Sequence, residues 1–390
     1  MENKKIGIGI IGAGAVAPAH IAGYLAYPEL CEIRAVCNST VEKAEKLIAE
    51  NGLDAASAVS DYRELLAMPE IEAVSICLPP SMHAQVTVDA LRAGKHVLCE
   101  KPMAGSLEEC DAMLRAAFES GKLLSIVAQN RYKTPYWKMK QLIDKGALGA
   151  PRFAKVDSLW WRGENYYDIW WRGTWEKENG GCFMSHAVHH IDLAQWLFGM
   201  PESVSAFVTN VGHHNSECED FGVAVFSYEG MITEFTASLV THSEGQEISV
   251  QGEKAGVSVP WGVWANTPLS NGFPEKNGAA IEEIQKMYDE LPELEKEGHT
   301  AQIGNFLRAI SGEETLLIDG LQGRNTIELI TAVYKASCTH TPVTLPIKEE
   351  DVFYGKGGAA AAMPHFFEKT KSVAEVKLDR PISYGRDVGK

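Results

Sequence analysis

The sequence has few features of a membrane, secreted or nucleic-acid-binding protein. It has no apolar run long enough to cross a bilayer, and no apolar leader with a small-residue cleavage site follows Met1. Acidic residues predominate, with 52 Asp and Glu against 36 Lys and Arg, and the net charge of -16 argues against binding to phosphate backbones. These absences predict a cytoplasmic protein that binds neither membranes nor nucleic acid.

The chain also lacks C-x-x-C pairs, although it contains eight cysteines. Cys37, Cys77 and Cys99 lie in apolar runs, where a buried thiol behaves as a small hydrophobic side chain. We therefore expect reduced, unbridged cysteines. His186 and His190 are spaced as some zinc ligands are, but no H-E-x-x-H pattern or third spaced ligand accompanies them, so no metal site is predicted.

The pattern of apolar runs predicts two domains of different architecture. Over residues 1–125, short strand-like runs alternate with helical segments, which is typical of parallel βαβ units and a Rossmann-type, doubly wound sheet. Over residues 126–345, strand-like runs follow one another without helices between them, which indicates an α+β domain with a mostly antiparallel open sheet. Such an open sheet favours pairing of subunits into a homo-oligomer. Residues 346–390 are expected to form a tail or an oligomer arm.

The first strand leads into a glycine-rich turn. Residues 6–11 are apolar, and Gly12-Ala13-Gly14-Ala15-Val16-Ala17 then forms a G-x-G-x-x-A pattern that opens a helix. The first glycine permits a tight turn, the second lets the backbone approach a pyrophosphate, and Ala17 permits close helix packing. The helix N-terminus favours an anion. This segment predicts a dinucleotide site.

The end of the second strand bears on the choice of dinucleotide. NAD sites usually have an acidic residue there that binds the ribose hydroxyls. Asn38 can hydrogen-bond a ribose but has no charge to repel a 2′-phosphate, and Lys43 is placed to reach one. No arginine follows the strand, which favours NAD and leaves NADP open. The candidate cofactor-binding residues are Gly12, Gly14, Ala15, Val16, Asn38, Ser39, Lys43, Pro79, His83, Glu100, Lys101 and Asn130.

Three further segments carry a family resemblance. They are Glu100-Lys101-Pro102 after a strand, Gly180-Gly181 before a helix, and His189-x-x-Asp192 within that helix. Together with the glycine pattern they resemble the Gfo/Idh/MocA family of sugar and inositol oxidoreductases, over about residues 5–345. The combination of the first segment with the later two is specific, whereas each alone is not.

Lys101 is the predicted catalytic residue. Hydride transfer from an alcohol needs a base for the hydroxyl proton. Lys101 follows a parallel strand at its carboxyl end, where open α/β sheets build their sites. A buried lysine beside a cationic nicotinamide has a lowered pKa and can share that proton.

A helix predicted over residues 183–198 supplies the partner of Lys101. Ser185, His189 and Asp192 form one polar stripe, at i, i+4 and i+7. The resemblance makes His189 the acid/base partner near the reacting hydroxyl. The family often has Asp where this chain has Ser185, so the simpler prediction is a Lys101–His189 pair, with Ser185 as a hydrogen-bond partner and Asp192 as an orienting carboxylate.

An aromatic segment, residues 160–175, is the predicted substrate loop. It contains five tryptophans, two tyrosines and two arginines. Aromatic faces stack on sugars and arginines donate to hydroxyls or carboxylates, although aromatic core packing is the alternative. The run from Tyr166 to Thr174 resembles a subgroup that oxidises C3 of pyranosides. The candidate substrate-binding residues are Arg131, Tyr166, Tyr167, Trp171, Arg172, Ser185, His186 and His189.

These residues predict an NAD(P)-dependent dehydrogenase that oxidises a ring hydroxyl, at C3, of a sugar glycoside. The alternatives are an inositol dehydrogenase and a redox-neutral glycosidase, in which transient oxidation at C3 labilises the glycosidic bond and NAD is regenerated. A non-catalytic sugar sensor is less favoured, because a sensor needs neither Lys101 nor His189.

Overall fold

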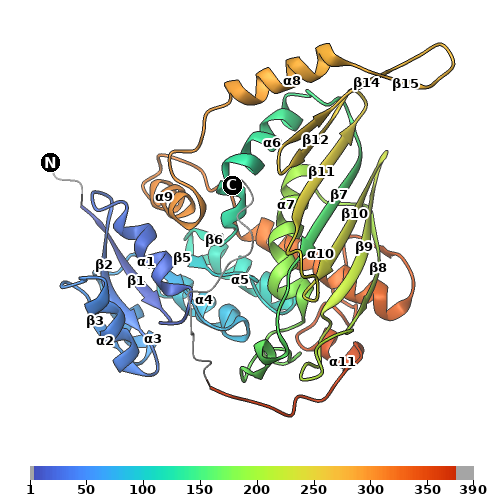
Figure 1. Cartoon of the computed structure of the whole chain (residues 1–390). Coiled ribbons are helices and arrows are strands. Elements are labelled where there is room, and N and C mark those ends of the chain that lie inside the picture. Colours follow the sequence, from blue (N-terminus) through green and yellow to red (C-terminus); the bar gives the residue numbers. More distant parts are fainter. Residues whose placement is uncertain (1–3, 375–390) are drawn as a thin grey trace. The chain divides into compact units, whose positions relative to one another are not determined.

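A computed structural model describes residues 4–374 (Figure 1). In this structure the chain forms two compact units. Unit 1 contains the chain up to Tyr132 together with Lys296–Ile327. Unit 2 contains Lys133–Glu295 and the chain from Glu328 onward. Among the described residues, no helix is both long enough and apolar enough to cross a membrane.

Unit 1 is built on a six-stranded parallel sheet with the strand order β3-β2-β1-β4-β5-β6. This is the order of a doubly wound dinucleotide-binding fold, with the topological switch between β1 and β4. The predicted Rossmann architecture is therefore confirmed. Its strands are β1 (Ile6–Ile11), β2 (Cys31–Cys37), β3 (Ser57–Val59), β4 (Ala73–Ile76), β5 (His96–Cys99) and β6 (Leu124–Ile126).

The helices of unit 1 begin and end where local side chains satisfy the backbone. Ser106 caps α5 by accepting a hydrogen bond from the Glu109 N–H, and Gly121 ends that helix with φ +64°. Asp61 caps α3 in the same way. The helices are α1 (Ala17–Leu25), α2 (Val41–Glu50), α3 (Tyr62–Ala67), α4 (His83–Arg92) and α5 (Leu107–Ser120), with short 3-10 turns η1 (Pro80–Met82) and η2 (Gln129–Tyr132).

Unit 1 differs from the expected domain of residues 1–125 because a later helix completes its core. Helix α9 (Gly298–Ile310) packs on α1 and buries Ile303, Phe306 and Leu307 in the cluster that contains the strands of the parallel sheet. Gly23 permits this approach, since a Cβ there would lie 2.4 Å from Ile303. Apolar burial, rather than sequence continuity, thus sets the unit boundary.

Unit 2 is built on an eight-stranded sheet with the strand order β13-β12-β11-β7-β10-β9-β8-β16. Only β7 and β10 pair in parallel, and the other pairs of this sheet are antiparallel, as predicted. The strands are β7 (Pro151–Leu159), β8 (Ser203–Thr209), β9 (Phe221–Tyr228), β10 (Met231–Ser238), β11 (Gln246–Gly252), β12 (Gly256–Val259), β13 (Gly262–Trp264) and β16 (Val343–Thr344).

Alternation along these strands leaves one sheet face with exposed apolar side chains. Val223, Val225 and Ile232 are exposed, whereas the residues between them, such as Ala224, are buried. Helices α6 (Thr134–Asp144), α7 (Val188–Phe198) and α8 (Gly278–Glu290) contact strands of this sheet. The unit also contains the later part of α10 (Gly320–Thr339) and α11 (Gly358–Ala362).

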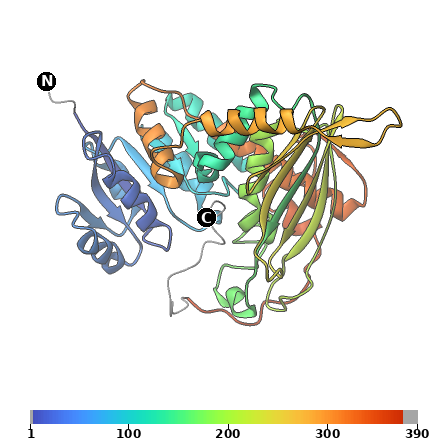
Figure 2. The ribbon, with the colours of Figure 1, turned by 45° about the horizontal axis from the view of Figure 1, so that its top comes forward.

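Two local features of unit 2 were not predicted. Residues 266–300 contain a small hairpin, β14 (Asn266–Pro268) with β15 (Pro274–Lys276), before the single surface helix α8 (Figure 2). The helix expected over residues 183–198 instead begins with a π-helical turn, η4 (Phe183–Ala187), followed by α7. Such turns widen a helix and often occur at functional sites.

The C-terminal segment was expected to be a tail or an oligomer arm, but residues 366–373 bind the aromatic loop of their own chain. Val373 forms a parallel bridge with Ile169, and the Lys369 ammonium donates to the Tyr167 carbonyl. Asn215 joins the two segments, accepting from the N–H groups of Thr370 at 2.8 Å and Lys371 at 2.9 Å. Residues 375–390 of the predicted tail lie outside the described residues.

Candidate functional site

The glycine turn of unit 1 has the shape that a pyrophosphate requires. Gly12 has φ +105°, and a Cβ there would lie 2.3 Å from the Cys77 carbonyl oxygen, so only glycine fits. Gly14 and Ala15 are exposed at the surface of the turn. No side chain caps helix α1, which follows directly, and its first turn has no acidic residue. The exposed turn and this helix end fit an anionic dinucleotide.

Asn38 is partly engaged in holding this turn. Its Oδ1 accepts from the Ala13 N–H at 3.2 Å, and its Nδ2 donates to the Thr40 carbonyl at 3.0 Å. An amide nitrogen carries two donor hydrogens, so Asn38 retains capacity toward a ribose hydroxyl. Ser39 and Lys43 are exposed beside it. The contacts of Asn38, Ser39 and Lys43 with a dinucleotide stay predictions.

Lys101 is half-buried after β5, and the residue before it is held by two histidines. Glu100 Oε1 lies 2.9 Å from His20 Nε2 and 3.3 Å from His299 Nε2. Burial disfavours the charged form of Glu100, but these hydrogen bonds hold the pKa of its carboxyl well below the usual range. Its second oxygen accepts from the Lys101 N–H at 3.3 Å. Glu100 therefore holds the backbone that carries Lys101.

The hydrogen bonds of His20 continue into the sheet. Burial lowers the pKa of this fully buried ring, so it is neutral and its Nε2–H donates to Glu100. Its Nδ1, 3.0 Å from Ser75 Oγ, then accepts from the Ser75 hydroxyl, which in turn accepts from Tyr24 at 2.8 Å. The hydrogen bonds from Tyr24 through Ser75 and His20 to Glu100 therefore all run in the same direction, and each acceptor has a donor. The ligand atoms of His20, Glu100 and His299 lie within 4.8 Å of one another, as metal ligands can, and the hydrogen bonds account for that proximity.

His83 holds the other side of the same segment, and its predicted contact with the cofactor is wrong. The ring is fully buried, with Nδ1 2.7 Å from the Pro102 carbonyl and Nε2 2.8 Å from the Leu78 carbonyl. It joins the end of β4 to the segment after β5. The Glu100 side chain, also expected at the cofactor, is only 5% exposed and faces the two histidines. Both residues are therefore positioning residues for the Lys101 segment.

The structure also corrects the prediction for Arg131. This arginine is fully buried, and its guanidinium donates to the Gln322 side chain and to the Leu317 carbonyl, both in unit 1. It therefore ties η2 to the segment that leads into α10, and it does not present a donor to a substrate. Asn130 is buried at 7% exposure, and Pro79 lies half-buried at the end of the segment after β4.

In unit 2, the Gly180-Gly181 pair allows a buried carboxylate to hold the start of the π turn. Glu219 accepts from the N–H groups of Gly181 at 3.0 Å and Phe183 at 3.1 Å, and the Tyr334 hydroxyl donates to it at 2.9 Å. A Cβ on Gly181 would lie 1.8 Å from the Glu219 carbonyl oxygen, so a side chain there would prevent this approach. Burial raises the pKa of Glu219 to about 7, although these donors oppose the shift.

The polar residues of the predicted helical stripe have different surroundings. The Ser185 hydroxyl donates to the Gly181 carbonyl at 2.8 Å, so it accepts from His186 Nδ1–H, also at 2.8 Å. His189 is half-buried on α7, and Asp192 is 4% exposed on the same helix. His190 is fully buried against Ser158 at 2.9 Å, and burial lowers its pKa to about 3.

The aromatic loop is part core and part surface. Trp160, Tyr167 and Trp175 are buried, Trp161 and Trp170 are exposed, and Tyr166 and Trp171 are half-buried. The Arg172 guanidinium lies 4.1 Å from the Tyr166 ring centroid and 4.2 Å from that of Trp171. Core packing therefore accounts for Trp160, Tyr167 and Trp175, and the role of the other aromatic side chains in binding a substrate stays a prediction.

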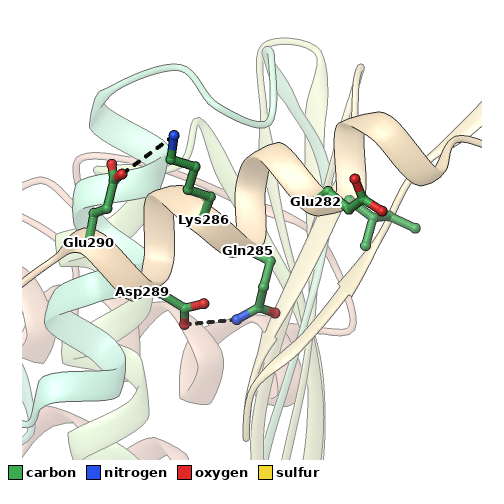
Figure 3. A pocket seen from close by; sticks show the side chains of 6 residues that line it. Glu282, Gln285, Lys286, Asp289 and Glu290 are labelled. Atoms are coloured by element: carbon green, nitrogen blue, oxygen red, sulfur yellow. Dashed lines mark hydrogen bonds and ion pairs between the residues drawn. The ribbon is translucent and has the colours of Figure 1, made fainter.

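A surface hollow beside α8 is separate from all of these groups. Figure 3 shows side chains of this one helix around it, with Gln285 bonded to Asp289 at 2.9 Å and Lys286 near Glu290 at 3.8 Å. The lining residues are Ile281, Glu282, Gln285, Lys286, Asp289 and Glu290. None of them is a predicted site residue.

Comparison with known proteins identifies the family. Residues 6–128 match the model of an oxidoreductase family with an NAD-binding Rossmann fold, and residues 136–258 match the model of a GFO/IDH/MocA C-terminal domain. The chain belongs to the Gfo/Idh/MocA oxidoreductase family. The predicted family and NAD-binding domain are thus confirmed, and the protein is a nicotinamide-dependent oxidoreductase.

Several relatives act on or bind sugars. D-glucoside 3-dehydrogenase of Escherichia coli (strain K12) is 26% identical, and the match covers 88% of this chain and 99% of the relative. The WlbA dehydrogenase from Bordetella pertussis, solved with NADH and UDP-GlcNAcA, is 28% identical with a TM-score of 0.77, covering 89% of this chain and all of the other. Levoglucosan dehydrogenase shares the fold, with a TM-score of 0.74 and 20% sequence identity. That match covers 88% of this chain and all of the other.

Sequence reasoning missed His20, His299 and Glu219. His20 had a weak signal, because it is a histidine among the mostly apolar residues that face inward from α1. His299 and Glu219 had none, since each acts on a residue far away in the sequence. All eight cysteines are unbridged, as predicted, and seven are buried.

Proposed function

We propose that the protein oxidises a ring hydroxyl, at C3, of a sugar glycoside to the keto-glycoside. The observation that carries the proposal is the half-buried Lys101 at the carboxyl end of β5, on a backbone held by Glu100 and His83. The glycine turn, Pro79 and Lys101 follow β1, β4 and β5. Because these strands are neighbours in a parallel sheet, their carboxyl ends lie at the same edge, and so do the lysine and the glycine turn. The sugar relatives support the substrate class.

The chemistry divides between cofactor and chain. When bound, the nicotinamide accepts a hydride from the ring carbon. The Lys101 amine takes the hydroxyl proton as the C–H bond breaks, so that the alcohol becomes a ketone and the lysine becomes an ammonium. His189 is the proposed second acid/base group in unit 2, with Ser185 orienting His186 beside it. Asn38, Ser39 and Lys43 are proposed to contact the ribose, and NAD is favoured over NADP.

The proposal is tested by offering glycosides and inositols with NAD and NADP separately. Absorbance of the reduced nicotinamide reports turnover, and NMR of the product locates the new ketone. Oxidation of inositols only would make the protein an inositol dehydrogenase. Release of free aglycone without net reduction of NAD would make it a redox-neutral glycosidase.

The role of Lys101 is tested with Lys101→Met, which removes the amine and keeps the aliphatic stem. We expect kcat to fall by about 100-fold or more, because a positioned acid/base group contributes 10²–10⁴. NADH affinity, measured by fluorescence, should change little. Lys46→Met is the matched control, since Lys46 lies exposed on α2 and pairs only loosely with Glu50 at 3.7 Å. Turnover of Lys101→Met within a few-fold of wild type would refute the role.

A further inference from the structure

Both arginines of the aromatic loop already have carboxylate partners. Arg172 Nη1 lies 2.9 Å from Glu178 Oε1, and the Glu178 side chain is 2% exposed. Arg162 Nη1 lies 3.0 Å from Glu244 Oε1. Each guanidinium charge is therefore compensated within unit 2.

The Arg172 pair is held in place by further contacts. Glu178 Oε2 also accepts from the Gly173 N–H at 2.6 Å, which fixes the carboxylate on the loop backbone. The guanidinium lies over the rings of Tyr166 and Trp171. Moving Arg172 toward an anionic ligand would leave the carboxylate of Glu178 buried without its cation, which is strongly unfavourable.

Two lysines of the same region are also engaged. Lys177 lies 4.9 Å from the Trp170 ring centroid, and Lys369 donates to the Tyr167 carbonyl. A ligand that carries a negative charge here would lose its hydration, and the two arginine charges that could compensate it are already paired with carboxylates.

This arrangement contacts η4, the π turn that directly precedes the helix of His189. The rings of Trp160 and Tyr166 lie 5.5 Å and 5.7 Å from the ring of His186, three residues before His189. Arg162 lies 5.4 Å from the Trp160 ring centroid. The paired arginines and the proposed acid/base histidine thus belong to one neighbourhood within unit 2.

We propose that this neighbourhood selects an uncharged sugar ring, so that the substrate is a neutral pyranoside and not a uronate. The proposal rests on the proposed function and names its substrate class. Neutral hydroxyls can hydrogen-bond to the edges of a paired guanidinium and carboxylate without separating them. Because one solved relative binds a nucleotide-linked uronate, similarity alone does not decide the question.

The test compares the best neutral pyranoside of the substrate screen with its counterpart that has a carboxylate at C6. Methyl glucoside and methyl glucuronide form such a pair. We expect kcat/KM of the wild type to favour the neutral sugar by about 100-fold, which is about 2.8 kcal/mol at 1.4 kcal/mol per tenfold. Glu178→Gln frees the Arg172 charge and should raise the ratio of uronate to neutral activity by about tenfold or more.

Two further variants keep the test decisive. Glu244→Gln frees Arg162 and should move the ratio in the same direction if Glu178→Gln fails to fold. Glu253→Gln breaks the exposed ion pair of Glu253 with Arg152, also in unit 2, and should leave the ratio unchanged. Equal wild-type activity on both sugars, or an unchanged ratio in a folded Glu178→Gln or Glu244→Gln variant, overturns the neutral-ring inference alone. Absence of oxidation of every sugar in the screen refutes the proposed function itself.

Discussion

Replacing Glu100 by glutamine is expected to destabilise unit 1 and to misplace Lys101. Glutamine has the same shape, but its uncharged amide oxygen accepts more weakly from the two histidines, and its amide nitrogen cannot accept from the Lys101 N–H. Hydrogen bonds to a charged group contribute about 1.5–3 kcal/mol and neutral ones about 0.5–1.5 kcal/mol. The two bonds, at 2.9 Å to His20 and 3.3 Å to His299, thus predict a loss of about 2 kcal/mol.

Glu100→Ala should cost more than Glu100→Gln. It leaves the N–H of the fully buried His20 without its acceptor, and an unsatisfied buried donor costs about 1–3 kcal/mol beyond the lost hydrogen bonds. For a unit of this size, 1 kcal/mol shifts the melting temperature by about 2–4 °C. We therefore expect a fall of roughly 4–8 °C for the glutamine variant and a larger fall for the alanine variant, measured by differential scanning fluorimetry.

The pH dependence of this effect has a definite sign. The pKa of Glu100 is held below its ordinary value of 4.5 in the folded protein, so its contribution is present above that value and is lost as the pH falls toward the folded pKa. Wild type and Glu100→Gln should therefore differ most at neutral pH and converge in acid. Burial also lowers the pKa of His20, which makes both proteins less stable below its ordinary value of 6.5.

Activity separates positioning from general stability. At a temperature where both proteins are folded, we expect kcat of Glu100→Gln to fall by about tenfold, a barrier change of about 1.4 kcal/mol, while NADH affinity stays nearly unchanged. Glu72→Gln is the matched control, because Glu72 pairs with the exposed Lys4 at 2.9 Å in the same unit. Unchanged stability and kcat in Glu100→Gln, or an effect as large in Glu72→Gln, would refute the positioning role of Glu100.

Two other predictions concern unit 2. Asn215→Ala removes the side chain that joins the C-terminal segment to the aromatic loop. KM for the sugar should therefore rise several-fold with kcat little changed, and trypsin should cleave residues 366–373 faster. Equal KM and equal cleavage would contradict this prediction. Ile232→Lys places a charge on the exposed apolar face of the sheet and should shift a homo-oligomer toward monomer in light scattering, whereas a monomeric wild type would contradict the proposed pairing.

The fold was largely predictable because its signals are local. The apolar runs, the helix caps such as Ser106 and the glycine turn at Gly12 each reflect residues close together in the sequence. Gly180-Gly181 and Lys101 were found through their motifs. The sequence did not reveal the partner of each motif, because these partners are distant in the sequence. Glu219 is the carboxylate that binds the Gly181 N–H, and His299 is the second histidine that contacts Glu100, the residue before Lys101.

The errors at the candidate site have a common physical origin. Arg131, His83 and Glu100 are polar residues beside the predicted cofactor edge, and sequence position alone does not say whether such a side chain faces a ligand or the interior. The structure pairs all three with buried groups, as is usual for polar side chains enclosed in a core. Proximity in sequence to a motif therefore indicates membership of a site more reliably than it indicates contact with a ligand.

The Lys101 backbone depends on residues from both parts of the chain that form unit 1. Helix α9 contributes both His299, which contacts Glu100, and the core residues Phe306 and Leu307. The residues that fix the Lys101 backbone thus come from two stretches of chain separated by most of unit 2. Because α9 also packs on α1, the helix that follows the glycine turn, we expect a change that displaces α9 to affect both the Lys101 backbone and the glycine turn.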